Sequence, residues 1–369
     1  MIKYFYADSL KAYFECIREI EEVVIGRKNV SGNYFSVEKP PILWYRGLSH
    51  VTHSLTPSLY RGKENGKGTE KYSSLHNAEE IRTQHYIAKN YHYFNLKPSS
   101  RIEWLEVMQH HGMKTRVLDW SESSVHSLIF ALGAFFELID CIANDKQTSM
   151  PCVWVMDPGG LNKEIFKEIA NEITAEHPLF WTLDLKYREK KRINNILNEL
   201  KRVLDKEENF FEEKDVTHLN YILNLSAIHD EYIQNLPQIK ALLLQGEVVP
   251  IIYYILLRIY SEGYIQEKKA LPPLSIVNPY HSERIKAQKG VFSVFPFYKE
   301  EEIDKKLRKM GIVPEGMENN KVAQDYLYKI VLLKPQRIVE EMIANGMDGG
   351  WLYPELPTMA KLIENHKVE

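Results

Sequence analysis

Apolar residues recur at helical spacing near the start of the chain. Within Ala7–Val24, one stripe collects Leu10, Tyr13, Phe14, Ile17 and Ile20, which is the pattern of an amphipathic helix that buries one face. Asp8 or Ser9 is available as the N-cap, and Gly26 fits the end of this helix. The chain has further helical segments, which we expect over Glu79–Asn90, Arg101–His110 and Ser124–Ile142.

Short apolar runs bounded by proline and glycine predict β-strands. Such runs are Pro40–Gly47, Cys152–Met156, Leu274–Val277, Gly290–Phe297 and Tyr326–Leu333. After the last of these runs, Pro335 fits the start of a helix over Gln336–Ala344, and Gly346 fits its end. A final helix is expected over Leu356–His366.

The middle third of the chain shows helical patterns and no convincing strand. A helix is expected from Asn162–Ala170 onward, the charged stretch Lys186–Lys214 has leucine and isoleucine at helical spacing, and Val216–Tyr260 is more apolar. We therefore expect an α+β protein whose mixed or antiparallel sheet is built from N- and C-terminal segments. In this division residues 1–160 and 271–369 form one core, and residues 161–270 form a helical insertion or subdomain.

Composition narrows the class of protein only slightly. The 369 residues are 44% hydrophobic and 26% charged, with a formal net charge of −3, so no global charge attracts nucleic acid or an anionic membrane. The three cysteines form no C-x-x-C pair, which predicts reduced core residues in a cytoplasmic protein. The apolar runs Val125–Ile142 and Val248–Tyr260 contain charges or proline, so we expect buried helices and no membrane span.

The stretch Gln109–Ser123 (QHHGMKTRVLDWSES) concentrates polar chemistry between apolar segments. Such groups need partners when buried, so the stretch predicts a polar site or an internal hydrogen-bond network. Arg116 and Asp119 are three residues apart, and we expect them to form an ion pair. His110 and His111 are adjacent and cannot face one direction on a helix, so one of them is the candidate for the site. No His, Asp and Glu set has metal-ligand spacing.

Several sequence blocks together resemble the FRG domain family. The blocks are WYRG at Trp44–Gly47, LTPSLYR at Leu55–Arg61, QHHGMKTRVLDW at Gln109–Trp120, RIKAQKGVF at Arg284–Phe292 and LYPEL at Leu352–Leu356. Lys114 and Ser121 depart mildly from the family pattern, which usually has Pro and Thr there. The resemblance spans most of the chain outside the helical middle.

The Tyr45-Arg46-Gly47 triplet is also similar to the strand end that begins the NAD site of many ADP-ribosyltransferases. This similarity implies an ADP-ribosyltransferase-like fold and NAD as a substrate; no other cofactor is expected. It also implies a carboxylate near Glu283–Phe292 that stabilises an oxocarbenium-like transition state. The chain offers Gln288 there, with Glu283 nearby.

The resemblance assigns a role to each candidate residue. Arg46, with Arg61 nearby, would hold phosphate or ribose oxygens, Gly47 would receive the nicotinamide or base, and Trp44 or Tyr45 would stack. Gln288 with His110 or His111 would orient the ribose, and Gln109, Arg116 and Asp119 would support the wall of the site. For Arg46 the structural alternative is a buried arginine that ties the strand end to carbonyl groups or a carboxylate.

Three hypotheses about function follow. The leading one is an NAD- or nucleotide-binding protein, an ADP-ribosyltransferase-like transferase or NAD glycohydrolase, in a toxin or phage-defence role. The second is a nucleotide or nucleic-acid hydrolase that uses His110 or His111 with Asp119. The third is a non-enzymatic binding module whose helical middle recruits a protein partner.

Overall fold

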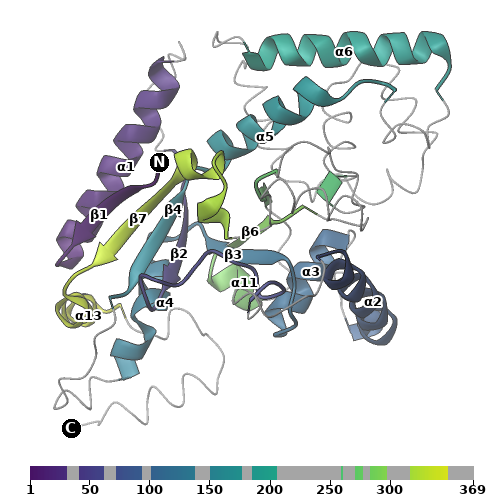
Figure 1. Ribbon diagram of the computed structural model, residues 1–369. Helices are drawn as coiled ribbons and strands as arrows, with labels where there is room; N and C mark the ends of the chain where they lie inside the picture. The colour runs from purple at the N-terminus through teal and green to yellow at the C-terminus, as the bar shows by residue number, and fades with distance from the viewer. Residues whose placement is uncertain are drawn as a thin grey trace.

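The computed structural model describes residues 1–30, 41–61, 72–93, 101–137, 150–176, 185–205, 259–260, 271–276, 283–296 and 316–347. Within these residues, seven strands form one mixed sheet flanked by helices (Figure 1). The predicted helix Leu356–His366, the LYPEL block and most of Val216–Tyr260 lie outside the described residues.

The sheet joins strands from both ends of the chain. Its order is β1-β7-β4-β2-β3-β6-β5, with only the β1–β7 pair parallel. The strands are β1 (Lys3–Ala7), β2 (Trp44–Leu48), β3 (Val117–Ser121), β4 (Cys152–Met156), β5 (Leu274–Ile276), β6 (Gly290–Val294) and β7 (Leu327–Leu332). This confirms the predicted α+β class and the predicted mixed sheet. The division into a core and an insertion stays a prediction.

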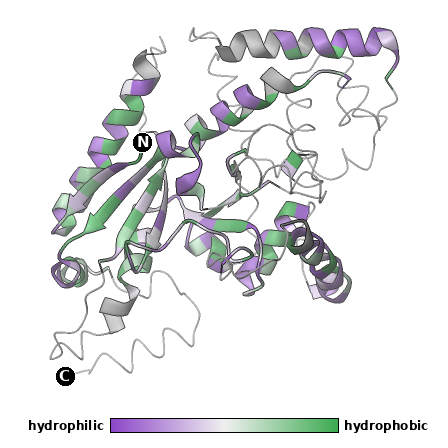
Figure 2. Cartoon of the chain, viewed as in Figure 1, coloured by the Kyte–Doolittle hydropathy of each residue, from purple (hydrophilic) through white to green (hydrophobic). Residues whose placement is uncertain are grey.

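Helices cover both faces of the sheet. Neighbouring residues of a strand point to opposite faces, so the strands bury apolar side chains on both. Tyr45 packs in a core with α1 (Leu10–Val30), α4 (Ser124–Glu137) and α13 (Pro335–Ala344). Trp44 packs in the other core, which includes residues of α3 (Arg101–His110) and α5 (Pro158–Glu172). The strands β4 and β7 are buried along their whole length, and hydrophobic residues mark the strands at the centre of the sheet (Figure 2).

The remaining described elements lie at the edges of this framework. The helix α2 (Tyr72–Asn90) contacts α3, and the hydrophilic helix α6 (Tyr187–Asp205) contacts α5 (Figure 2). The short elements are η1 (Tyr91–Tyr93), α11 (Glu283–Ala287), η5 (Met317–Asn319) and η6 (Ala323–Tyr326). None of the helices in the described ranges is long and apolar enough to cross a bilayer.

Most predicted elements within the described residues are present. The first helix uses Ser9 as its cap, since its Oγ accepts from the Ala12 N–H at 3.2 Å. The prediction that Gly26 ends this helix is wrong, because α1 continues to Val30. One exposed glycine lowers helix stability by only about 1 kcal/mol.

The sequence patterns did not predict the strands β1 and β3. Tyr4 and Tyr6 of β1 are exposed at the sheet edge, and the polar content of the stretch around β3 masks its strand pattern.

Gly47 sets the distance between β2 and α4. A Cβ atom there would collide with the Ser127 carbonyl oxygen and lie 2.6 Å from the Ala131 nitrogen. We predict that Gly47→Ala lowers the free energy of unfolding by about 1–3 kcal/mol or more, measured in urea, because backbone atoms must move.

Gly26→Ala is the matched control. Gly26 lies inside α1, and no atom lies within 4 Å of the place that an added methyl group would take, so this variant should gain about 0.5–1 kcal/mol. Equal effects of the two substitutions would contradict the assignment of Gly47 to helix packing.

Candidate functional site

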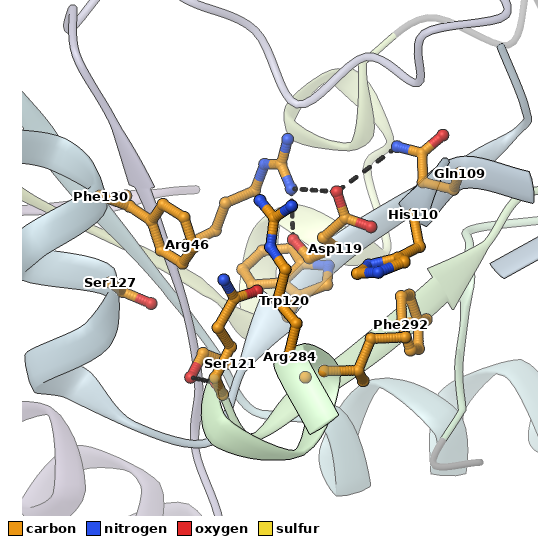
Figure 3. A pocket seen from close by; sticks show the side chains of 14 residues that line it. Arg46, Gln109, His110, Asp119, Trp120, Ser121, Ser127, Phe130, Arg284 and Phe292 are labelled. Atoms are coloured by element: carbon orange, nitrogen blue, oxygen red, sulfur yellow. Dashed lines mark hydrogen bonds and ion pairs between the residues drawn. The ribbon is translucent and has the colours of Figure 1, made fainter. Parts of the chain in front are cut away.

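A cleft opens where two neighbouring strands diverge. The strand β2 pairs with β4 over five residues but with β3 only through Tyr45 and Ser121. Beside this divergence lies a cavity of about 260 Å³, lined by Arg46 and Gly47 of β2, by Asp119–Ser121 of β3, and by residues of α3, α4, α11 and β6 (Figure 3). This volume is slightly below the range of about 300–1,000 Å³ that is typical of ligand pockets.

Arg46 spans the divergence and replaces part of the missing strand pairing. Its Nη1 donates a hydrogen bond to the backbone oxygen of Asp119 and lies 3.9 Å from the Asp119 Oδ2 (Figure 3). Only 15% of the Arg46 side chain is exposed. Burial lowers its pKa, the Asp119 charge raises it, and the nearby Arg61 charge lowers it. An arginine remains protonated in proteins, so the cleft holds a fixed positive charge.

One donor of Arg46 has no acceptor. The Nε atom is buried and forms no hydrogen bond within the described ranges. A buried donor without an acceptor costs free energy, so it favours the entry of a group that can accept. Arg46 therefore fits the structural alternative, through its bond to the Asp119 carbonyl, and also lines the cleft as the ligand hypothesis expects.

Gln109 orients the Asp119 carboxylate. Its Oε1 accepts hydrogen bonds from Thr115 Oγ1 at 2.7 Å and Ser58 Oγ at 3.2 Å, and its Nε2 donates to Asp119 Oδ2 at 3.4 Å. Ser58 belongs to the LTPSLYR block, and its Oγ also accepts from the Thr115 N–H at 3.1 Å. Two of the sequence blocks thus meet in one hydrogen-bond network that supports the cleft.

The opposite wall is the turn from α11 into β6. Ser121 Oγ donates to the Gln288 carbonyl oxygen at 2.7 Å, and the Glu122 N–H donates to the Lys289 carbonyl oxygen at 3.0 Å. Lys289 has a φ of 47°, the left-handed conformation that closes this turn. The buried His126 ring bonds to the Gln288 backbone; burial lowers the His126 pKa, and this hydrogen bond opposes the shift. The turn places Arg284 and Gln288 on the cleft (Figure 3).

Arg116 lies away from the cleft, and its predicted ion pair with Asp119 is wrong. Arg116 directly precedes β3, and side chains three positions apart on an extended chain point to opposite sides. Arg116 is fully buried and pairs with Glu79 of α2. It also donates to the Phe295 oxygen at 3.0 Å and to the Tyr260 oxygen at 2.6 Å.

The cleft gathers six of the predicted site residues and leaves out five. The lining includes Arg46, Gly47, Gln109, His110, Asp119 and Gln288. Outside it, Trp44, Tyr45 and Arg116 are buried in the protein, whereas Arg61 and His111 are exposed. The Gly47 backbone reaches the cleft, but its missing side chain is explained by α4 packing. Sequence reasoning missed several lining residues, among them Ser127, Phe130, Arg284 and Phe292. Arg284 is the first residue of the RIKAQKGVF block, and membership in that block is the signal that could have identified it.

Metal and thiol chemistry find no support in the described ranges. No group of three or more His, Cys, Asp or Glu residues could hold a metal ion there. Cys16 and Cys152 are buried free thiols, and burial raises the pKa of Cys152 to about 11, as is typical of a structural cysteine.

The comparison with protein families identifies part of the chain. The family model of the FRG domain matches residues 41–135, so this segment is an FRG domain. The matched segment supplies Arg46, Gln109, His110 and Asp119, whereas Arg284 and Gln288 lie beyond it. Comparisons with curated proteins and with solved structures return no match.

Substitutions of Arg116 and Asp119 should change the free energy of unfolding by different amounts. Arg116→Ala leaves Glu79 buried without its cation, so we predict a loss of about 3–5 kcal/mol in the free energy of unfolding. Asp119→Asn should change it by less than about 1 kcal/mol, because the carboxylate is 52% exposed. Urea titrations of both variants test this, and similar losses would contradict the separation of Arg116 from the cleft.

Proposed function

We propose that the cleft binds NAD or a related nucleotide and that the protein is an ADP-ribosyltransferase-like transferase or NAD glycohydrolase. The observation that carries this proposal is the meeting of Arg46, His110, Asp119 and Gln288, which come from distant parts of the sequence, in one cleft. Convergent polar groups with an adjacent aromatic surface are typical of small-molecule sites.

The lining residues match the parts of such a ligand. The Arg46 guanidinium offers forked donors to phosphate or ribose oxygens. Gln288 and His110 offer hydrogen-bonding groups that suit ribose hydroxyls, and Phe130 and Phe292 offer apolar surface for a base (Figure 3). At about 260 Å³, the cleft holds part of a dinucleotide, with the remainder at its open side.

Asp119 is the carboxylate that the proposed chemistry needs. The sequence resemblance implied that group near Glu283–Phe292, but the carboxylate that lines the cleft comes from β3 and is 52% exposed. In the proposed reaction, the bond from ribose C1′ to the nicotinamide nitrogen breaks, and its electron pair leaves with nicotinamide. The Asp119 charge stabilises the oxocarbenium-like centre. Water or an acceptor group then bonds to C1′ and gives its proton to His110.

An NAD-consuming activity would suit a toxin or phage-defence effector. Such a protein would act in the cytoplasm, where NAD is available, and the helical middle would contact a protein partner. These roles are part of the proposal.

Arg46→Ala tests ligand binding. We predict that NAD or ADP-ribose at 100 times its dissociation constant stabilises the natural protein by about 2.7 kcal/mol, and that this gain is lost in the variant. Thermal-shift titration measures it. Arg18→Ala is the matched control, because Arg18 is exposed on α1 and pairs with Glu22. An unchanged ligand response in Arg46→Ala would refute the assignment.

Asp119→Asn tests catalysis separately from binding. We predict that nicotinamide release from NAD, followed by chromatography, falls at least about a hundredfold, because the neutral amide cannot stabilise a cationic centre. Binding of ADP-ribose should persist in this variant. Binding by the natural protein without nicotinamide release would instead favour the binding-module hypothesis.

A further inference from the structure

We infer that Arg46 and Arg284 together form a binding site for a diphosphate group, and that Asp119 occupies this site in the ligand-free protein. The inference rests on the proposed function and deepens it by naming the ligand group that the two arginines recognise. It also assigns to Asp119 a second task, which is competition with the ligand for Arg46.

Charged side chains of both signs line the cleft. The described lining residues include two guanidinium groups, from Arg46 and Arg284, and one carboxylate, from Asp119. Both arginine side chains reach into the cleft on the side of Asp119 (Figure 3). Both guanidinium groups offer charged, planar donors to an anion in this partly enclosed space.

The contact between Arg46 and Asp119 is loose and leaves a donor of Arg46 without an acceptor among the described residues. Their closest charged atoms are 3.9 Å apart, whereas a strong charge-assisted hydrogen bond measures about 2.7–2.9 Å. Arg46 spends one nitrogen on the Asp119 backbone oxygen and keeps its buried Nε without an acceptor in the described ranges. Asp119 thus neutralises Arg46 without saturating its donors.

The two elements that present the arginines explain why the ligand group is a diphosphate. Arg46 comes from β2 and Arg284 from α11, and both side chains reach toward Asp119 from these two separate elements (Figure 3). A diphosphate has two linked phosphoryl groups, and each can accept forked hydrogen bonds from one guanidinium. A single carboxylate such as Asp119 offers two oxygen atoms and cannot match this set.

Ligand entry then has a consequence for Asp119. When a diphosphate oxygen replaces Asp119 at Arg46, the carboxylate loses its cationic partner and is free to face the ribose. The Gln109 Nε2 donor, 3.4 Å from Asp119 Oδ2, keeps the carboxylate at the cleft during this exchange. Binding and the placement of the carboxylate are thereby coupled through one guanidinium.

Calorimetric titration with inorganic pyrophosphate at low salt tests the inference without a nucleoside. We predict that Arg46→Gln and Arg284→Gln each weaken binding at least about tenfold, which is 1.4 kcal/mol. Asp119→Asn should instead tighten binding about threefold or more, because it removes the competing charge. Arg18→Gln, the exposed control on α1, should bind as the natural protein does.

Two controls separate a lost binding site from a misfolded variant. Circular dichroism shows whether each variant is folded, and Arg284→Lys retains the positive charge. Lysine keeps the charge but lacks the forked donors, so binding by a folded Arg284→Lys variant should fall between that of the natural protein and that of Arg284→Gln. Unchanged affinity in folded Arg284→Gln, weaker affinity in Asp119→Asn, or no binding of pyrophosphate to the natural protein would each overturn the inference.

The same variants separate this inference from the proposed function. If pyrophosphate responds as predicted but NAD is neither bound nor cleaved, the diphosphate site stands and the proposed function fails. If NAD binding requires Arg46 but not Arg284, the proposed function stands and the diphosphate site fails.

Discussion

The buried ion pair between Arg116 and Glu79 fixes the strand from which the cleft is built. Arg116 is fully buried, and its guanidinium also donates to the carbonyl groups of Phe295 and Tyr260. These contacts join α2, Phe295 just after β6, and Tyr260 to the start of β3. A buried charge that loses its partner is costly, so β3 has little freedom to shift. The position of Asp119, three residues along, follows from this anchor.

The cleft exists because the sheet is incomplete next to this anchored strand. Tyr45 and Ser121 are the one pair that joins β2 to β3 in the described residues, and Arg46 supplies a side-chain donor to the Asp119 carbonyl. Gly47 brings α4 against β2 on one side, and the turn at Lys289 holds Arg284 and Gln288 on another. A ligand in this cleft would meet strands and helices on several sides, a rigid setting that favours precise placement.

The sequence revealed those features that depend on periodicity. The buried run Cys152–Met156 was predicted with its observed bounds, and Pro335 with Gly346 marked the helix α13. The strand β3 within Gln109–Ser123 was not recognised. Some polar residues of this stretch belong to a buried network and others line the cleft, and this mixture hides the alternation of apolar and polar residues in β3. The partner of Arg116 could not be predicted, since Glu79 is 37 residues away and the contact depends on tertiary packing. The family blocks did mark Arg46 and the Arg284–Phe292 segment, but sequence alone could not show that they meet.

The divergence of β2 and β3 forms, on this account, a site in which Arg46 exchanges Asp119 for a ligand anion. A crystal structure with ADP-ribose bound measures this exchange directly. We predict phosphate oxygens within hydrogen-bond distance of Arg46, with the Asp119 carboxylate farther from that guanidinium than its present 3.9 Å. Ligand density at another site, or phosphates elsewhere with the contact between Arg46 and Asp119 unchanged, would contradict it.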